Sequence, residues 1–570
     1  MKNYKTLVGI LLFSIYFLIL LFTSKSIGIF WDEPAYFSSS LKYLEWFKNP
    51  SLSTIDDYFL SYAPGQFELH PPLEKILQAG SYEIFYNHLG FFDQVTSFRF
   101  PNILISSLLL LAIYIFCLKY FNFTVALSSS LFLITTPRFF AHAHFAVMDV
   151  PMTFFVFLAS WAFWKYRDKS LIIPGILIGL ALSVKLTGLL FIIPFSIFLL
   201  VRSVIQKKNF IKTLIRLSII PITALIILFI LWPKLWLSPV KRLIEFFGFF
   251  STNSVPFWYF GTTYPKPPWH YAPVMLGITT PLPIIFFLML GILSIFIIKE
   301  KRELKLFVLI NFLFLPVFIS LPKISAYDAE RLMLPSFPFM VILAGLGVSL
   351  LINCLSFLIK KNKPNTYKSE DNKFFAEISE KAPMTLENSN KTSLSNNFKK
   401  NFVVELLSNN LIYIIIFLSF LFSLSMLVHY YPFELSSYNL LIGGLKGAEK
   451  NGMEPQYSVE SYKATLDFIN NNCPENCTVY VYSNSGPYYW YQKDGLIRKD
   501  IKFDQDFLKI PSSVYFVVLP IKKSVFVWKV AKIYLNVVPV FSYKIDDVSI
   551  VNIYNMKDIQ NFYKESTINF

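Results

Sequence analysis

The sequence predicts a polytopic α-helical membrane protein that ends in a small α/β domain, and three observations support this fold class. Of the 570 residues, 54% are apolar and 15% are charged, whereas soluble domains contain about 25% charged residues. Apolar runs long enough to cross a bilayer, which takes about 20 helical residues, recur up to residue 428. Residues 429–570 instead alternate short β-branched runs with helical patterns.

We expect about eleven membrane-spanning helices. Their predicted bounds are 7–23, 101–118, 123–139, 150–164, 171–184, 187–201, 214–232, 273–297, 306–321, 335–359 and 410–428. The first run is taken as a span and not as a signal peptide, because no small-residue cleavage pattern follows it. Spans 171–184 and 187–201 form one apolar stretch interrupted at Lys185, since a charge there requires a turn or a polar cavity.

The basic residues predict the orientation of the chain. The formal net charge of +16 would suggest a nucleic-acid partner in a soluble protein, but most Lys and Arg residues lie in short loops between apolar runs. With Lys2 and Lys5 in the cytoplasm, the positive-inside rule is satisfied in loop after loop. The residues then inside are Lys119, Lys165, Arg167, Lys169, Arg202, Lys207, Lys208, Arg302, Lys305, Lys360 and Lys361. We therefore expect a multi-pass protein of the cell membrane with a cytoplasmic N-terminus and no nucleic-acid partner.

Composition divides the chain into four parts. Residues 1–359 form a transmembrane module, and residues 410–428 form the last span. Between them, residues 360–409 are rich in Lys, Asn, Ser and Glu and predict a disordered cytoplasmic linker. Residues 429–570 predict an outer α/β domain with strands at 478–483, 513–519 and 548–554 and a helix at 459–471. In this domain Cys473 and Cys477 fit either a disulfide or two reduced thiols.

Two outer loops contain apolar residues at helical spacing, which predicts helices lying in the membrane interface. The residues are Phe37, Leu41, Leu44 and Phe47 in the first loop and Val240, Leu243, Ile244 and Phe247 after the seventh span. Such helices could roof a cavity that opens towards lipid, or they could only anchor their loops.

Three carboxylates are predicted at the outer membrane surface. Asp32 and Glu33 directly follow the first span, and Asp149 directly precedes the fourth. A partly dry site raises the basicity of a carboxylate, as a general base requires. An isolated acidic pair is more often a solvated loop start, so these residues are candidates and not assignments. Asp149 could also orient a substrate.

Four basic residues lie on the side of the membrane that the positive-inside rule disfavours. Arg99 opens the second span, Arg138 closes the third, Lys185 lies in the break, and Arg331 precedes the tenth. A lipid phosphate at headgroup depth is a suitable partner, because Arg offers a bidentate fork and Lys a point charge. Any one of them alone could instead snorkel or pair with an acid.

Further polar and aromatic candidates for substrate binding lie in the outer loops. They are His70 in His-Pro-Pro-Leu, His270 and Tyr271 in Trp-His-Tyr, and Tyr327 and Asp328 in a short loop. Proline restricts where such side chains can point. The Tyr327–Arg331 loop fits an internal ion pair equally well.

No local spacing of ligands indicates a metal centre or a cofactor. His70, His142, His144 and His270 are scattered over several loops, so a zinc site has no sequence signature here. A divalent metal stays open as the alternative. The triplet at 504–506 is similar to the acidic motif of nucleotide-sugar transferases, but no Gly-rich phosphate loop accompanies it.

In their order along the chain, these motifs resemble family 39 membrane glycosyltransferases of the C-type (GT-C) fold, the group of protein mannosyltransferases and lipid A aminoarabinose transferases. The resemblance covers about residues 7–359. Its elements are Asp32-Glu33, His70-Pro71-Pro72-Leu73, Arg99-Phe100-Pro101, Met148-Asp149, Lys185, Trp269-His270-Tyr271, Thr279-Thr280-Pro281-Leu282, and Tyr327-Asp328 with Arg331. Around the last motif, Ala329, Glu330 and Leu332 depart from the family pattern.

The resemblance implies an inverting transfer of a monosaccharide from a polyprenyl-phosphate carrier to a hydroxyl of a lipid, glycan or protein acceptor at the outer face. Asp32 matches the catalytic carboxylate of the family and Arg99 its phosphate-binding arginine. In this scheme Asp32 accepts the acceptor proton, while Arg99 and Lys185 stabilise the leaving phosphate.

A transporter or flippase of an anionic lipid-linked substrate is the alternative, since outer cations and a broken pair of spans suit it too. It would need polar groups at mid-membrane depth. The spans are instead dominated by Leu, Ile and Phe, and the candidate residues gather at one face.

Overall fold

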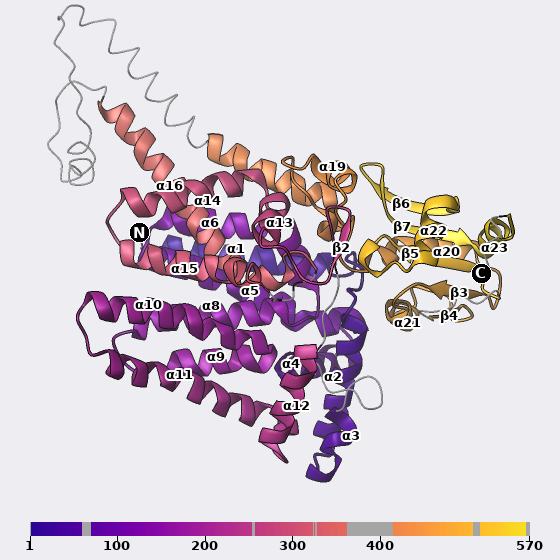
Figure 1. Cartoon of the computed structure of the whole chain (residues 1–570), viewed down its shortest axis with the longest axis horizontal. Helices are drawn as coiled ribbons and strands as arrows, with labels where there is room; N and C mark the ends of the chain where they lie inside the picture. The colour runs from indigo at the N-terminus through magenta and orange to yellow at the C-terminus, as the bar shows by residue number, and fades with distance from the viewer. Residues whose placement is uncertain are drawn as a thin grey trace, which may run out of the picture.

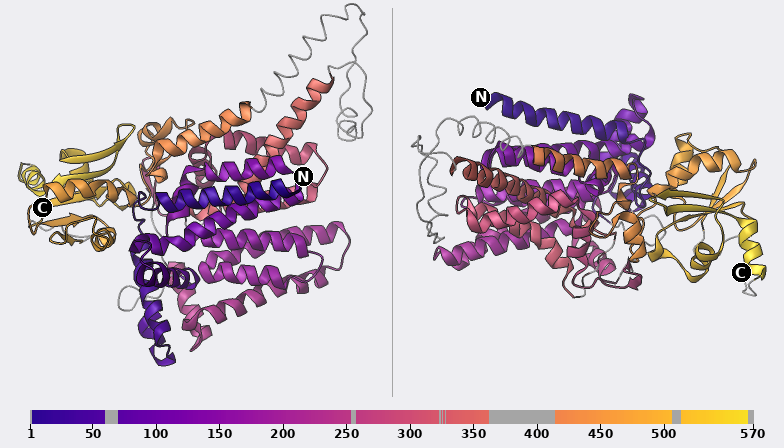
Figure 2. Two further views of the ribbon diagram at one scale, coloured as in Figure 1. Left: turned by 180° about the vertical axis from the view of Figure 1, so that it is seen from behind. Right: turned by 90° about the horizontal axis from the view of Figure 1, so that it is seen from above.

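The computed structural model describes residues 2–59, 70–252, 257–322, 324, 326, 328–361, 414–505 and 513–565. Its helices form a bundle with a sheet region at one end, and the N-terminus lies at the opposite end (Figures 1 and 2). The loop between α10 and α11 lies at the N-terminal end as well (Figure 1). The predicted linker 360–409, apart from Lys360 and Lys361, lies outside the described residues.

Each predicted span coincides with one helix or with two consecutive helices. The bundle consists of α1 (Lys2–Thr23), α5 (Gln94–Tyr120), α6 (Phe123–Ile134), α7 (Pro137–His144), α8 (Asp149–Tyr166), α9 (Ile172–Val184), η3 (Leu186–Phe191), α10 (Ile192–Ile205), α11 (Phe210–Leu231), α13 (Tyr271–Thr279), α14 (Leu282–Ile297), α15 (Arg302–Ile319), η5 (Arg331–Ser336), α16 (Phe337–Lys361) and the helix Ile414–Tyr430. Five of the described helices are long and apolar enough to cross a membrane, or six if one bent pair counts as a span. A multi-pass membrane protein is thus supported, and the number eleven stays a prediction.

Two spans that we expected to be continuous are broken, and a proline explains each break. The helices α6 and α7 meet at 71°, where Thr136 is extended just before Pro137. Likewise Thr280 is extended just before Pro281, between α13 and α14. The ring of a proline disfavours helical backbone in the residue before it. The predicted spans 123–139 and 273–297 were therefore wrong as single helices.

The interruption predicted at Lys185 is confirmed. Lys185 has extended backbone angles between α9 and η3. At Gly188 a Cβ atom would lie 2.8 Å from the backbone carbon of Ala181, so only glycine lets the chain fold back this closely. The break therefore holds Lys185 away from regular helix, with its side chain buried.

Short helices and a hairpin lie at the end of the bundle nearest the sheet region. They are α2 (Glu33–Lys48), η1 (Leu52–Thr54), α3 (Ile55–Phe59), α4 (Leu73–Tyr82), η2 (Glu83–His88), η4 (Pro233–Leu235), α12 (Pro239–Thr252), β1 (Phe257–Tyr259) and β2 (Thr262–Tyr264). In Figure 1, α2 and α3 run across the direction of the bundle helices. The helices expected in the two outer loops are thus present.

Of the four apolar residues predicted on one face of α2, only Phe47 is exposed, so most of this face does not point to lipid as expected. The ring of Phe37 is fully buried, stacks on Phe98 at 4.5 Å and meets the edge of Trp490 at 5.1 Å. This face therefore packs on α5 and on the C-terminal region. In α12, by contrast, Val240 and Ile244 are exposed, as the interfacial interpretation requires.

The C-terminal region is a five-stranded mixed sheet with helices on both faces. The strand order is β4 (Lys502–Asp504), β3 (Thr478–Val481), β5 (Phe516–Pro520), β7 (Val548–Asn555) and β6 (Phe541–Ile545). Strands β4, β3 and β5 are parallel, whereas β7 is antiparallel to β5 and β6. The other elements are η7 (Glu434–Ser436), α19 (Gly444–Lys450), η8 (Glu460–Thr465), α20 (Leu466–Asn472), α21 (Gly486–Lys493), η9 (Lys523–Val525), α22 (Trp528–Asn536) and α23 (Met556–Glu565). The three strands predicted from the sequence are all present.

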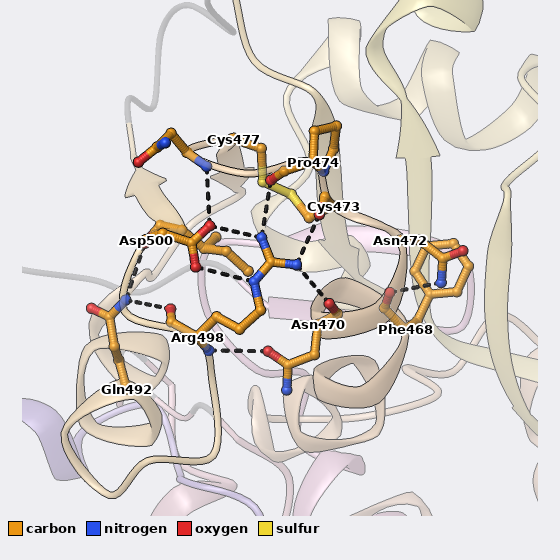
Figure 3. The surroundings of a disulfide bond; sticks show 11 residues. Phe468, Asn470, Asn472, Cys473, Pro474, Cys477, Gln492, Arg498 and Asp500 are labelled. Atoms are coloured by element: carbon orange, nitrogen blue, oxygen red, sulfur yellow. Dashed lines mark hydrogen bonds and ion pairs between the residues drawn. A yellow bond between two sulfur atoms is a disulfide. The ribbon is translucent and has the colours of Figure 1, made fainter.

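A disulfide joins Cys473 and Cys477 just after α20 (Figure 3). Arg498 donates to the backbone oxygens of Asn470 and Cys473 at 2.8 and 2.9 Å and pairs with Asp500 at 2.7 Å. The guanidinium thus satisfies carbonyl groups left open at the end of the helix. Of the two states that the sequence allowed for these cysteines, the structure contains the disulfide.

Candidate active site

Three segments each contribute one residue to a buried cluster of one carboxylate and two cations at the sheet end of the bundle. Asp149 begins α8, Lys185 lies in the break after α9, and Arg331 begins η5. Lys185 Nζ donates to Asp149 Oδ1 at 2.6 Å, and Arg331 Nε donates to Asp149 Oδ2 at 2.8 Å. Both oxygens of Asp149 are therefore occupied by cations. Residues that the sequence separates by up to 182 positions are brought together here.

Arg331 extends this contact to two more carboxylates. Its Nη2 donates to Asp32 Oδ2 at 2.6 Å and its Nη1 to Asp328 Oδ2 at 3.1 Å. The guanidinium also packs over the ring of Phe30, 4.7 Å from its centroid. We call Asp32, Asp149, Lys185, Asp328, Arg331 and Lys522 the central network. Four of its members were predicted as catalytic or phosphate-binding residues.

Asp32 is the accessible acid of the central network. Its side chain is 28% exposed, whereas that of Asp149 is 1% exposed. Arg331 donates to Asp32 Oδ2, and no described residue forms a hydrogen bond with Asp32 Oδ1. Asp32 is also the N-cap of α2, where the helix dipole stabilises a negative charge. The structure thus positions one carboxylate oxygen and leaves the other accessible.

An apolar cavity of about 160 Å³ opens beside Lys185. Lys185 and Thr187 form its polar side, and Leu, Ile and Phe side chains of η3 and α15 form most of the rest. An apolar cavity with one cation at its edge suits a molecule that combines a hydrocarbon chain with a phosphate.

Arg99 lies in a separate and closed ion pair. Its guanidinium binds Glu33 through Nε and Nη2, both at 2.7 Å. The remaining N–H groups donate to the backbone oxygens of Ser24, Ile27 and Gly28. All five N–H groups of Arg99 are therefore used, and the side chain is fully buried.

Glu33 is equally saturated. Besides Arg99, its oxygens accept from the backbone N–H groups of Phe30 and Ala146, at 2.7 and 2.9 Å. The Arg99–Glu33 pair thus links the loop after α1 to α5 and to the chain before α8. It does not join the central network.

Arg138 also lies outside the central network. Its Nη1 donates to Glu330 at 2.8 Å, and its Nε and Nη2 donate to the backbone oxygen of Ser437. The guanidinium lies between the rings of Tyr438 and Tyr457, at 4.8 and 5.0 Å. Arg138 therefore links α7 to the segment around Ser437 that precedes the sheet. Its partner Glu330 is one of the residues that depart from the family pattern.

Of the predicted aromatic and histidine residues, some lie next to the central network and others lie away from it. His70 lies next to the central network. Burial and the charges of Lys185 and Lys75 lower the pKa of His70 well below its ordinary value, which favours the neutral imidazole. Tyr271 begins α13 and is buried. His270 instead pairs with Tyr259 through Nδ1 at 2.9 Å. Tyr327 lies outside the described residues.

Among the described residues, no three His, Cys, Asp or Glu side chains gather as metal ligands. His144 contacts the hydroxyl of Thr23 and the backbone oxygen of Phe140. It is therefore held within the bundle by two ordinary hydrogen-bond contacts.

Lys522, which reaches the central network from the sheet region, could not be identified from the sequence. Its Nζ donates to Asp328 Oδ1 at 2.8 Å and to the backbone oxygen of Tyr457 at 2.7 Å. Ser458 in the same region accepts from the backbone N–H of Trp31 at 2.9 Å. Neither residue lies in a recognisable motif, so only the fold reveals their position.

Part of the chain matches a known protein family. Residues 69–236 match the family model of the dolichyl-phosphate-mannose-protein mannosyltransferases. This match confirms the family resemblance predicted from the motifs, and its span includes His70, Arg99, Asp149 and Lys185. No curated protein sequence gives a match.

Three solved structures are similar at low sequence identity. ArnT from Cupriavidus metallidurans, bound to undecaprenyl phosphate, is 14% identical with a TM-score of 0.48, and the match covers 96% of this chain and 98% of that one. The oligosaccharyltransferase of Archaeoglobus fulgidus is 13% identical with a TM-score of 0.45, covering 93% of this chain and 70% of that one. The Pmt1-Pmt2 protein O-mannosyltransferase complex of S. cerevisiae, bound to its sugar donor, is 20% identical with a TM-score of 0.31, covering 44% and 34%.

Proposed function

We propose that this protein is an inverting glycosyltransferase that moves a monosaccharide from a polyprenyl-phosphate carrier to an acceptor hydroxyl at the outer face of the membrane. The observation that supports it most is the central network itself. It combines an accessible carboxylate, Asp32, with the cations Lys185 and Arg331 beside an apolar cavity. These are the three groups that such a reaction needs: a base, a phosphate site and a lipid site.

The donor phosphate would bind at Lys185 and Arg331. Both cations are held by Asp149, so an incoming phosphate would share them with this carboxylate. The first isoprene units would enter the cavity beside Lys185. Because Arg99 and Arg138 have their donors bound elsewhere, we assign both to positioning their segments and not to holding phosphate. Glu33 has the same positioning role.

Asp32 would act as the general base. Its free oxygen accepts the proton of the acceptor hydroxyl while that oxygen attacks the anomeric carbon from the side opposite the phosphate. The bond between the anomeric carbon and the phosphate oxygen breaks, and polyprenyl phosphate leaves with the bonding electrons. Lys185 and Arg331 stabilise the charge that develops on it. The leaving phosphate needs no proton, so no general acid is required.

The positive-inside rule supports an outer location for this site. The ion pairs of Arg202 with Asp168 and Glu303 join the α8–α9 loop, the end of α10 and the start of α15. These segments carry the basic residues predicted to be cytoplasmic. The central network lies at the other end of the bundle, beside the sheet region.

The test is turnover of defined donors by the purified protein. We would incubate it with polyprenyl-phosphate sugars and follow loss of donor and gain of product by mass spectrometry. Asp32→Asn should lower turnover by about 10²- to 10⁴-fold, the usual contribution of a general base, while donor binding is retained. Asp57→Asn, an exposed acid in the same outer loop, is the matched control and should keep full turnover.

Unimpaired transfer by Asp32→Asn would remove Asp32 as the base. If the unmodified protein consumes no polyprenyl-phosphate sugar but moves such a lipid between leaflets of a vesicle, the transferase proposal itself fails.

A further inference from the structure

Lys522 comes from a different part of the fold than the rest of the central network. It follows β5 in the sheet region, 191 positions after Arg331, and its side chain is 13% exposed. Its ammonium group lies 5.2 Å from the centroid of the Trp31 ring, next in sequence to Asp32. A lysine from the sheet region thus reaches the proposed active centre.

Lys522 and Arg331 share one carboxylate. Lys522 Nζ binds Asp328 Oδ1 at 2.8 Å, and Arg331 Nη1 binds Asp328 Oδ2 at 3.1 Å. Arg331 in turn binds both Asp32 and Asp149. Without the charge of Lys522, Asp328 would be a buried acid neutralised by Arg331 alone. Burial would then favour the protonated form of Asp328, which no longer holds Nη1 of Arg331 by its charge.

The loop that carries Lys522 is fixed by other contacts. Glu454 accepts from the backbone N–H groups of Lys523 and Ser524, at 2.6 and 2.8 Å. The next side chain, Lys523, pairs with Glu449 at 3.1 Å, away from the central network. The loop therefore has anchors that do not depend on the Lys522 side chain.

We propose that Lys522 is a positioning residue through which the sheet region completes the active centre: by holding Asp328, it keeps Arg331 aligned on Asp32 and Asp149. This rests on the proposed function and extends it. The sheet region is then part of the catalytic apparatus, and the site has its full geometry only while this region is docked on the bundle.

The charged groups around Asp328 determine how the site responds to pH. Burial acts to raise the pKa of Asp328, but the charges of Lys522 and Arg331 lower it below its ordinary value. Four other titratable groups also face this carboxylate, namely Glu330, Glu460, His142 and Tyr271. Removal of Lys522 should raise the pKa of Asp328, so that Asp328 becomes protonated at a higher pH and releases Arg331 there. The acid limb of the pH–turnover profile should move to higher pH.

The experiment compares Lys522→Met, Lys522→Arg and the matched control Lys523→Met. Lys522→Met should lower kcat by about 10- to 100-fold, as misplacement of a reacting group does. The KM for donor should change less than kcat, and the acid limb should shift to higher pH. Lys522→Arg should recover most of the activity. Lys523→Met should behave like the unmodified protein. Unchanged kcat and pH profile in Lys522→Met would overturn the proposal.

Two further measurements keep the test independent of the proposed function and of misfolding. Hydrogen exchange of residues 328–336 should be faster in Lys522→Met than in Lys523→Met, while exchange in β5 is the same in both. This can be read even if no donor is consumed, and equal exchange at 328–336 would refute the positioning role. In the double variant Lys522→Met/Asp328→Asn, the loss of kcat should not exceed that of Asp328→Asn alone, because both act through one contact. Additive losses would show that Lys522 does not act through Asp328.

Discussion

Two buried arginines at the same end of the bundle have opposite surroundings. Arg99 gives all its donors to one carboxylate and three backbone oxygens, and none of these groups is exposed. Arg331 binds three carboxylates from three different segments, and one of them, Asp32, is 28% exposed. The first arrangement is closed and the second can exchange a partner. The difference supports the proposal that Arg99 holds the fold and that Arg331 binds the substrate.

The comparison also explains why a buried ion pair is a poor guide to function by itself. A buried pair that is fully hydrogen-bonded contributes little net stability, yet the loss of one partner is costly because the other charge stays buried. Function requires a group that can change partners. In this protein the extra carboxylates, the partial exposure of Asp32 and the cavity beside Lys185 support the proposal that the central network is such a place.

The largest expected effect is the loss of fold in Arg99→Met. Glu33 and three backbone oxygens would be left buried without their cation, which costs about 3–5 kcal/mol. Thermal and denaturant unfolding in detergent would measure the change. The double variant Arg99→Met/Glu33→Met should be more stable than Arg99→Met, since no charge is left unpaired. A stable Arg99→Met protein with weakened donor binding would restore the phosphate role that the family resemblance implies.

Arg331→Met should instead affect turnover. The loss of one group that stabilises developing charge costs about 10²- to 10³-fold in kcat, and donor affinity should fall with it. Steady-state kinetics and direct donor binding would separate the two effects. Arg498→Met, which removes an arginine of the sheet region far from the central network, is the control. Full turnover by Arg331→Met would place the phosphate site elsewhere.

Much of the fold could be predicted because composition and periodicity are local properties. The break at Lys185 was predictable, since a charge cannot continue an apolar helix without a partner. The bends at Thr136 and Thr280 were missed, although the following prolines were visible. Hydrophobicity was given more weight there than the backbone restriction that a proline imposes on its neighbour.

The site was predicted as a set of residues but not as a geometry. All four basic residues that we predicted at the outer side were identified as unusual, and all four have acidic partners. Which partner each one takes depends on contacts between distant segments, such as Arg331 with Asp149 or Lys522 with Asp328. No local pattern reports such pairings. From the sequence alone, we therefore could not distinguish Arg99, whose N–H groups all bind buried partners, from Arg331, which binds a partly exposed carboxylate.

Arg99 and Arg331 are both paired with carboxylates, whereas Glu460 is a buried carboxyl group that forms no ion pair within the described part of the chain. Such a group should make the free energy of unfolding depend on pH. Glu460 is 1% exposed, and neither oxygen has a hydrogen-bond partner on another described residue. Burial raises the pKa of Glu460 from 4.5 to about 7. The folded state therefore keeps a proton that the unfolded state loses. The free energy of unfolding should fall as pH rises from 4.5 to about 7 and then level off, by up to ~3 kcal/mol.

Glu460→Gln tests this, because glutamine has the same shape and no charge. Its melting temperature should exceed that of the unmodified protein at pH 8 and differ little at pH 4.5. Glu475→Gln, an exposed acid of the same region, should show no such dependence. If Glu460→Gln lowers the melting temperature at pH 8, the carboxylate is ionised in the fold and has a cationic partner.

The smallest effect is expected at the exposed pair of Lys25 and Asp93. Their charged atoms are 3.2 Å apart, but the Lys25 side chain is 73% exposed, and exposed pairs contribute only about 0.2–1 kcal/mol. Lys25→Met should therefore change the free energy of unfolding by less than ~1 kcal/mol and leave turnover intact. Asp93→Ala should cost more, because Asp93 also caps α5 by accepting from the backbone N–H of Thr96 at 2.8 Å. An equal loss in both variants would show that water screens this pair less than its exposure indicates. The exposure of Asp32 would then be a weaker argument for separating Arg331 from Arg99.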